Sequence, residues 1–310
     1  MALPVTGSAA TFAALQTAIE TYLVANGWTL TSTVLSKGTQ YVKLTASTYE
    51  LLLNAGTGQS GSALTGPCAL GVKLLDFVAA PISWPVVYEL HALTTPDEVY
   101  ITINYNVDKF QHMHFGLSTI TEAGGTGFWF GGSFQSAVSR TSSSCKLYLQ
   151  NGAGIGAYVG AVPYDGFGLG YFFAAPTGAY QSSFIHCGLE GGAGWKTTYG
   201  GATGNLLGPD YSAALLYALP SDSSESDVLL PIHALLARAS QGQTIVASLA
   251  HARYCRMDNL FAGQLLSFGP DTWKIYPMHA RNEQQRDGVA WSTGAQHSGT
   301  FGVAIRYTGP

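Results

Sequence analysis

Apolar residues near the start of the chain recur every three or four positions. This spacing predicts one amphipathic helix over residues 9–26, with Ser8 as its N-cap and Gly27 just after its end. The apolar positions of this helix are Phe12, Leu15, Ile19, Tyr22 and Leu23. No comparably clear helix pattern follows, so the protein is expected to be mainly β.

After Gly27 the apolar period changes to two, which is typical of β-strands. Ser36-Lys37-Gly38 is expected as a hairpin turn in a small antiparallel sheet, against which the helix packs. A loop rich in Gly and Ser is expected from Gly56 to Pro67. The strands predicted in this part of the chain are Trp28 to Val34, Gln40 to Leu44, Tyr49 to Leu53, Val72 to Phe77 and Val86 to Leu93.

The clearest strand pattern runs from Val99 to Asp108, directly after a turn at Thr94 to Asp97. Successive side chains of a strand point to opposite faces. One face therefore carries Val99, Ile101, Ile103, Tyr105 and Val107, and the other carries Tyr100, Thr102, Asn104, Asn106 and Asp108. The first face is expected to belong to the core and the second to be polar.

Glycine and aromatic residues dominate the middle of the chain, where residues 116–208 hold more than half of the 38 glycines. Disordered segments contain few aromatic residues, so we expect long ordered loops that aromatic side chains hold in place. Six aromatic residues are the candidates for contact with another protein copy or with a ligand. They are Phe128, Trp129, Phe130, Tyr171, Trp195 and Tyr199.

Strand patterns return in the last third of the chain. Pro231 is expected at a sheet edge or a bulge, because proline cannot donate a backbone hydrogen bond. Ser221 to Asp227 is expected as an exposed polar loop. The predicted strands are Leu229 to Arg238, Thr244 to Arg256, Leu260 to Phe268, Thr272 to Tyr276 and Thr300 to Tyr307.

These patterns predict a mainly β (α+β) fold. An N-terminal amphipathic helix on a small sheet is followed by an antiparallel β-sandwich or barrel-like core with long Gly- and aromatic-rich loops. Residues 1–55 are expected to form the helix and small sheet, and residues 72–310 the main β domain. The boundary is placed between Leu53 and Gly71.

The chain is poor in charge, with charged residues making up 10% of 310 positions and a net charge of −4. Its 14 Lys and Arg are too few for a protein that binds nucleic acid through phosphate contacts. No stretch has the roughly 18 to 20 apolar residues of a membrane span, and the start lacks the basic residues of a signal peptide. So uncharged a surface favours a homo-oligomer or a larger assembly.

His112 and His114 lie two apart on a predicted strand, so both imidazoles share one face and the two Cα atoms are about 6.5 to 7 Å apart. Such a pair can bind a metal if a third ligand joins it, and His91, His186 and Asp108 are the candidates. The preferred interpretation is a pair of hydrogen-bonded, partly buried histidines. No metal or other cofactor is predicted, and the two histidines remain weak metal candidates.

Other catalytic patterns are incomplete. The chain lacks GxSxG, HExxH and GxxxxGK[ST], so no catalytic residue is predicted and the chain is not expected to be an enzyme. The carboxylates Asp165, Glu190 and Asp210 leave glycoside hydrolysis open. The acidic loop with Asp222, Glu225 and Asp227 lacks the spacing of a calcium loop. Cys68, Cys145, Cys187 and Cys255 are far apart and are expected to be reduced and mostly buried.

Four segments together resemble virion structural proteins of tailed bacteriophages. They are VYITINYNVDKFQHMHFG, GTGFWFGGSF, WKIYPMHARN and HSGTFGVAIRYTGP. The resemblance is one of general pattern and extends from NGWTL after the first helix to the C-terminus. It implies a symmetric neck, collar, tail or baseplate component of the virion, assembled in the host bacterial cytoplasm. No catalytic residue is implied.

Three hypotheses follow, and the first is preferred. The chain is a non-enzymatic structural subunit of a tailed-phage virion, a neck/collar or tail-associated symmetric assembly with itself and other virion proteins as partners. Alternatively, it is a carbohydrate-binding tail module or glycan depolymerase-like protein whose aromatic residues stack on sugar rings. The third hypothesis is a metal-dependent hydrolase that uses His112 and His114.

Overall fold

The computed structural model confirms a mainly β fold with antiparallel sheets and one α-helix near the N-terminus. Three large sheets account for most of the described strands. The structure describes residues 2–78, 81–141, 146–149, 161–164, 171–172, 182–189, 192–197, 207–208, 227–238, 242–257, 259–279 and 301–310.

The helix α1 (Phe12–Ala25) begins later than the sequence predicts. Its N-cap is Thr11, whose hydroxyl accepts a hydrogen bond from the Ala14 N–H at 3.1 Å. The expected N-cap, Ser8, instead lies in strand β1 (Val5–Ala9), which pairs with a strand far along the chain. Long-range strand pairing therefore sets the start of this helix, and Thr11 supplies the capping oxygen.

The N-terminal sheet has the strand order β13-β8-β5-β4-β3-β2. Gly38, with φ +58, makes the expected hairpin turn between β3 and β4. The expected loop from Gly56 to Pro67 contains a small hairpin of β6 (Gly58–Ser60) and β7 (Ala63–Thr65). The sheet strands are β2 (Thr29–Thr31), β3 (Val34–Lys37), β4 (Gln40–Ala46), β5 (Glu50–Gly56), β8 (Val72–Leu75) and β13 (Phe134–Gln135).

The central sheet has the strand order β1-β9-β10-β11-β12-β16-β17. Its middle is the hairpin of β10 and β11, in which Tyr100 is opposite His114 and Ile101 is opposite Met113. The strands that follow β1 are β9 (Val86–Leu93), β10 (Glu98–Asn106), β11 (Lys109–Leu117), β12 (Phe128–Gly132), β16 (Ser183–Cys187) and β17 (Gly194–Thr197). A 3₁₀ turn, η1 (Thr121–Ala123), precedes β12.

The C-terminal sheet has the strand order β18-β19-β20-β23-β22-β21. The register of β19 and β20 shifts between Pro231 and His233, so Pro231 lies at a bulge, as expected. The strands are β18 (Leu207–Gly208), β19 (Leu229–Arg238), β20 (Gly242–Arg256), β21 (Leu265–Phe268), β22 (Asp271–Pro277) and β23 (Phe301–Tyr307). A separate pair joins β14 (Lys146–Leu149) and β15 (Ala161–Tyr164).

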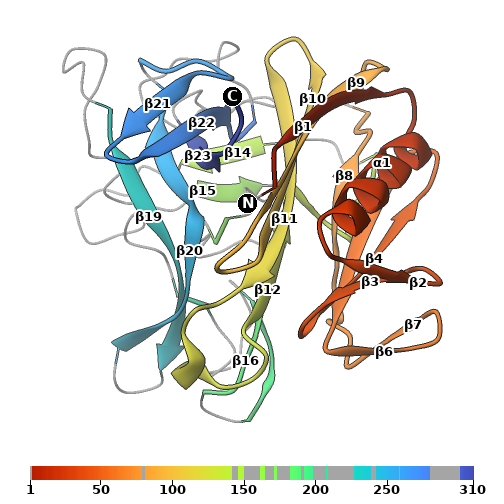
Figure 1. Cartoon of the computed structure of the whole chain (residues 1–310), viewed down its shortest axis with the longest axis vertical. Coiled ribbons are helices and arrows are strands. Elements are labelled where there is room, and N and C mark those ends of the chain that lie inside the picture. Colours follow the sequence, from red (N-terminus) through yellow and green to blue (C-terminus); the bar gives the residue numbers. More distant parts are fainter. Residues whose placement is uncertain are drawn as a thin grey trace.

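The central sheet lies between the other two sheets (Figure 1). One of its faces packs against α1 and the N-terminal sheet, and the other packs against the C-terminal sheet. Strands from before and after the predicted domain boundary are hydrogen-bonded to each other: β5 pairs with β8, and β1 pairs with β9. The N-terminal and central sheets therefore share one core.

Strand β10 departs from the sequence prediction on both of its faces. The polar-face residues Tyr100 and Thr102 are buried, because the C-terminal sheet covers them. Val107, expected in the core, is 86% exposed because it lies in the turn that follows the strand. The predicted alternation of side chains holds along most of the strand, but its polar face lies inside the protein.

Candidate functional site

The residues with the richest chemistry lie on the face of the central sheet that meets the C-terminal sheet. We call this set the polar layer. Strand alternation and pairing put all its members on one face. The members are Glu89, His91, Glu98, Tyr100, Thr102, His112 and His114, and all are buried.

His112 uses both ring nitrogens within the protein. Its Nε2 lies 2.9 Å from the Pro277 carbonyl oxygen, which can only accept, so Nε2 carries the hydrogen. Nδ1 then accepts from the Thr102 hydroxyl at 3.1 Å. Burial lowers the pKa of His112 to about 4, although the bond to Pro277 acts in the opposite direction. The ring is therefore neutral at pH 7 and ties β11 to β22.

His114 accepts a hydrogen bond from the backbone N–H of Tyr171 at 3.0 Å through Nε2. A backbone N–H can only donate, so this nitrogen must be unprotonated. The ring stacks on Tyr171 with 3.8 Å between centroids, and a Cβ added at Gly131 would lie 2.5 Å from Nε2. Burial, and then nearby His112, hold the pKa of His114 well below its usual range.

His91 pairs with β22 through a 2.9 Å hydrogen bond between Nε2 and the Tyr276 hydroxyl. Glu89 Oε1 lies 3.5 Å from the same nitrogen, but this contact is not an ion pair. Burial, followed by the charge of Lys274, lowers the pKa of His91 to about 3, so the ring is neutral. Glu89 instead pairs with Lys274, whose Nζ lies 2.8 Å from each carboxylate oxygen.

Glu98 joins the central sheet to β20. Its carboxylate accepts from the backbone N–H groups of Ala250 and His251 at 2.8 and 2.9 Å and from the Tyr100 hydroxyl at 2.7 Å. Burial raises the pKa of Glu98 to about 7, although these three donors and Arg253 lower it. A raised carboxyl pKa inside a protein is common at functional sites, but it also occurs in structural networks.

The two expected histidines share a face, as predicted, and both are buried and hydrogen-bonded. Their nitrogens do not converge on one point, because those of His112 are occupied by Thr102 and Pro277. The third-ligand candidate His186 accepts from the Thr126 N–H on another part of the sheet. Among the described residues, no group of three His, Cys, Asp or Glu side chains is arranged to hold a metal ion.

Most of the six contact candidates are core residues. Phe128, Trp129, Phe130 and Tyr171 are fully buried, so their side chains contact other parts of the same chain. The expectation of a contact surface is corrected for these four, because sheets cover both faces of β12 and because Tyr171, outside that strand, stacks on buried His114. Trp195 is partly exposed and donates from Nε1 to the Gly66 carbonyl oxygen at 3.0 Å.

Several sequence candidates fall outside the described residues. They are Tyr199, Cys145, Asp165, Glu190, Asp210, Asp222 and Glu225. Among the described cysteines, Cys68, Cys187 and Cys255 are free and buried, as expected. Asp227, the described end of the acidic loop, is exposed.

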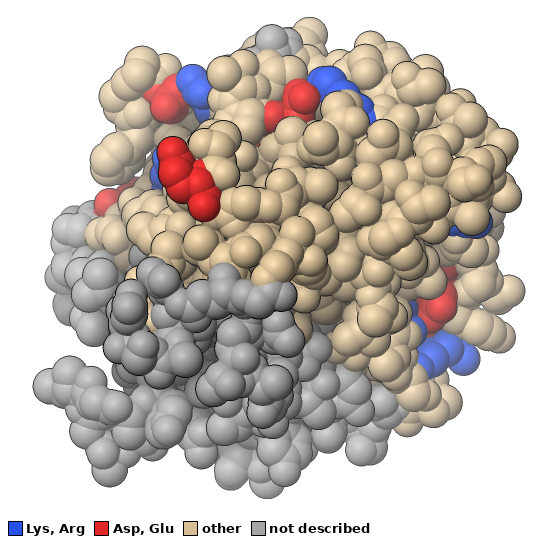
Figure 2. Space-filling model, turned by 90° about the horizontal axis from the view of Figure 1, so that it is seen from below, with Lys and Arg blue, Asp and Glu red and all other residues tan. Residues whose placement is uncertain are grey.

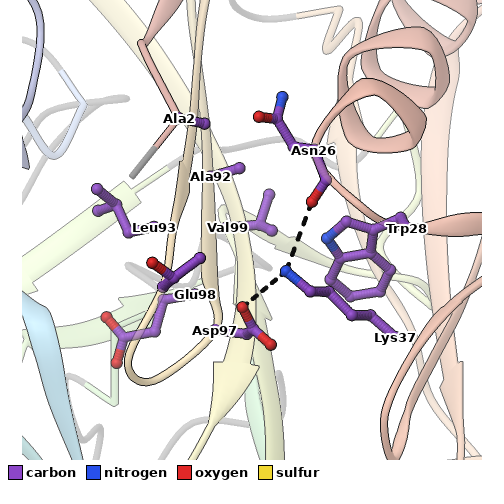
Figure 3. Close-up of a pocket in the computed structure, with 10 residues that line it drawn as sticks. Ala2, Asn26, Trp28, Lys37, Ala92, Leu93, Asp97, Glu98 and Val99 are labelled. Atoms are coloured by element: carbon purple, nitrogen blue, oxygen red, sulfur yellow. Dashed lines mark hydrogen bonds and ion pairs between the residues drawn. The ribbon is translucent and has the colours of Figure 1, made fainter.

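A small pocket lies between the end of α1 and the turn from β9 to β10 (Figure 3). Lys37 crosses it, with Nζ 2.8 Å from Asp97 Oδ1 and 3.5 Å from the Asn26 carbonyl oxygen. The volume is about 90 Å³, below the roughly 300 to 1,000 Å³ of ligand pockets. The Glu98 carboxylate points away from the Lys37–Asp97 pair, toward the C-terminal sheet.

Sequence reasoning missed Glu98, Lys274 and Tyr276 as members or partners of the polar layer. The alternation of β10 carried a signal, since it put Tyr100 and Thr102 on the same face. The partners of Glu98 on β20 and of His91 on β22 come from more than 150 positions later in the chain, which no local pattern reveals.

No protein-family model matches this chain, and no curated protein sequence matches it. None of the helices in the described part of the chain is long and apolar enough to cross a membrane.

Proposed function

We propose that this chain is a non-enzymatic structural subunit of a tailed-phage virion, in a neck/collar or tail-associated symmetric assembly. The observation that carries the proposal is an apolar edge on the C-terminal sheet. Phe261, Leu265 and Phe268 are 57%, 47% and 55% exposed, in and just before strand β21. Exposed apolar groups of this kind favour burial against another protein surface.

Strand β21 also has the backbone properties of an assembly edge. It is the outermost strand of its sheet, and within the described part of the chain it pairs with β22 alone, which leaves one side of β21 without a strand partner there. Soluble proteins usually protect such edges with charged residues or proline, and Leu265–Phe268 contains neither. A neighbouring copy that covers this edge would bury its apolar side chains, as subunit contacts do in closed rings.

The low charge of the surface agrees with this proposal. Figure 2 shows a face on which Lys, Arg, Asp and Glu lie in a few small groups between broad uncharged areas. In the polar layer, the groups that could act as acid or base are sealed between two sheets. Placement in a phage particle rests on the resemblance of the four segments quoted above.

The proposal is tested with surface variants at β21. Leu265→Asp and Phe268→Asp each put a charge on the apolar edge without touching the core. Val107→Asp is the matched control, because it makes the same change at an exposed valine in the turn between β10 and β11. Light scattering with negative-stain imaging should show multimers of the 32.6 kDa chain for wild type and control, and smaller species for both β21 variants.

Two results would contradict the proposal. A wild-type protein that stays monomeric and does not associate with purified phage particles would exclude a structural role in a virion. Multimers that survive both β21 substitutions would show that the contact lies elsewhere on the surface.

Glycan binding is the second candidate, and partly exposed Trp195 carries it. Aromatic rings at a surface suit the flat faces of sugars, although the Trp195 ring also packs edge-on against Phe128 and Phe130. A glycan array with wild type and Trp195→Ala tests this function. Signal that depends on Trp195 would support it, and an array without signal would remove it.

A further inference from the structure

We propose that the contact between the central and C-terminal sheets is an acid-sensitive joint, which opens on acidification before the contact between the central and N-terminal sheets. The joint is defined by the polar layer and its partners on β20 and β22. This inference is independent of the proposed function, because it depends on contacts within one chain.

The first support is the geometry of the cross-sheet hydrogen bonds. His91 contacts Tyr276, His112 contacts Pro277, and Glu98 binds two backbone N–H groups of β20. Titratable side chains of the central sheet therefore make these polar connections to the C-terminal sheet. The Pro277 bond requires a hydrogen on His112 Nε2, and the two β20 bonds require acceptor oxygens on Glu98, whereas the His91–Tyr276 bond can form with either group as donor.

His114 is the most restrictive of these groups. Protonation of Nε2 would set its new N–H against the Tyr171 N–H, and two donors cannot bond to each other. The Tyr171 carbonyl oxygen in turn accepts from the Tyr254 hydroxyl of β20 at 2.6 Å. Loss of the bond from Tyr171 to His114 would thus loosen a connection that runs from β11 through Tyr171 to β20.

The surroundings of His112 and His114 offer little compensation for added positive charge, whereas Glu89 Oε1 lies 3.5 Å from His91 Nε2. The carboxylates that face the histidines are engaged, Glu89 by Lys274 and Glu98 by three donors. The titratable and charged groups of the packed elements are Glu89, Glu98, Tyr100, Tyr171, Lys196, His251, Arg253, Tyr254, Lys274, Tyr276, His279 and Tyr307.

Linkage gives the direction of the effect. The folded pKa values of His91 and His112, about 3 and about 4, lie below the usual value of about 6.5, so their stabilisation is complete above pH 6.5 and is lost as pH falls. The pKa of His114 is also lowered and acts in the same direction. Glu98, with a folded pKa raised to about 7, opposes them between about pH 4.5 and 7. Because three histidines lose stabilisation as the pH falls and one carboxyl gains it, the net stability of the joint decreases on acidification.

The opposite face of the central sheet depends less on titratable groups. Its contact with α1 and the N-terminal sheet is made mostly by aliphatic and aromatic side chains such as Ile101, Met113 and Phe130. The Lys37–Asp97 ion pair also joins these two sheets, but its side chains are 24% and 27% exposed, so it contributes little stability. Burial of apolar area does not change with pH in this range. Acid should therefore separate the two contacts in order.

Three native cysteines report this order. Cys187 belongs to the core between the central and C-terminal sheets, and Cys68 to the core on the N-terminal side. Cys255 lies in a third cluster with Trp273 and Ile275 of β22. Labelling with an acid-active dithiodipyridine reagent from pH 7 to pH 4, followed by peptide mass spectrometry, measures each thiol separately.

We expect Cys187 to react at a higher pH than Cys68. His114→Gln keeps a hydrogen-bond acceptor but cannot be protonated, so the slope of the logarithm of Cys187 exposure against pH should fall by about one. For each pH unit of acidification, Cys187 exposure in the variant then rises by a factor about ten times smaller than in wild type. His233→Gln is the control, because His233 lies between Ile232 and Ala234, whose side chains face the joint, and should leave the slope unchanged.

Simultaneous exposure of Cys68 and Cys187 in the wild type would overturn the proposal, even if His114→Gln fails to fold. An unchanged slope in a folded His114→Gln variant would also overturn it. Cys255 distinguishes the mode of opening: continued protection means that the C-terminal sheet separates intact, and early reaction means that the sheet itself unfolds.

Discussion

Both faces of the central sheet are buried, but the side chains that make the contacts are apolar on one face and largely polar on the other. On one face, Ile101, Ile103, Phe115 and Phe130 pack against α1 and the N-terminal sheet. On the other, His91, Glu98, His112 and His114 make hydrogen bonds to or near the C-terminal sheet. Burial alone therefore does not distinguish them.

The difference lies in what each contact requires. Apolar packing is non-directional and tolerates small shifts, whereas a buried polar group must keep its partner or lose free energy. The polar face thus fixes the register of the C-terminal sheet on the central sheet. The apolar face contributes stability over a wider range of conditions.

The largest expected effect is on the apolar face. Phe130→Ala removes a fully buried ring that stacks on Phe184 at 4.8 Å between centroids. We expect the free energy of unfolding to fall by about 3–5 kcal/mol, from lost burial and the cavity left behind. Urea denaturation measures it. A loss below about 1 kcal/mol would show that this core can collapse around the cavity.

Glu98→Ala is the corresponding test of the polar face. It leaves two backbone N–H groups of β20 and the Tyr100 hydroxyl without their acceptor. Each unsatisfied buried donor costs about 1–3 kcal/mol, and relaxation limits the total to about 3 kcal/mol. Urea denaturation at pH 8, where Glu98 is ionised, gives the value. A neutral result would mean that Glu98 does not hold the sheets together.

Exchanging valine and threonine on the two faces gives the smallest expected effects and the most direct comparison. Val99→Thr buries a hydroxyl in the apolar core and should cost about 2 kcal/mol. Thr102→Val removes the donor to His112 Nδ1 and should cost about 1 kcal/mol. The two side chains have nearly the same shape, so denaturation at pH 7 compares chemistry alone. Equal costs would mean that the two faces do not differ as argued.

Local patterns were sufficient for most individual elements. The period of two predicted β9 and β19 over their full length and located β10 and β23 within two residues at each end. The spacing of Phe12, Leu15 and Ile19 identified α1, because helix geometry puts such residues on one face. The start of α1 was missed because β1 pairs with β9, a long-range contact.

The candidate site was predicted in part. Two histidines on one strand face were visible in the sequence, since alternation is a local property. Their partners were not, because Pro277, Tyr276 and Tyr171 are brought to them by sheet packing. The aromatic residues of β12 could not be assigned to core or surface, because both environments favour them.

The sequence by itself determined the strand periodicity, the early helix and the poverty of charge, since these depend on residues close together or on composition. The tertiary structure decided which faces are buried, because coverage depends on sheets that meet from distant parts of the chain. It made the polar face of β10 an interior layer and left Val107 in solvent. The identity of a side chain is known from the sequence, but its protonation state and its partners depend on the residues that pack over it.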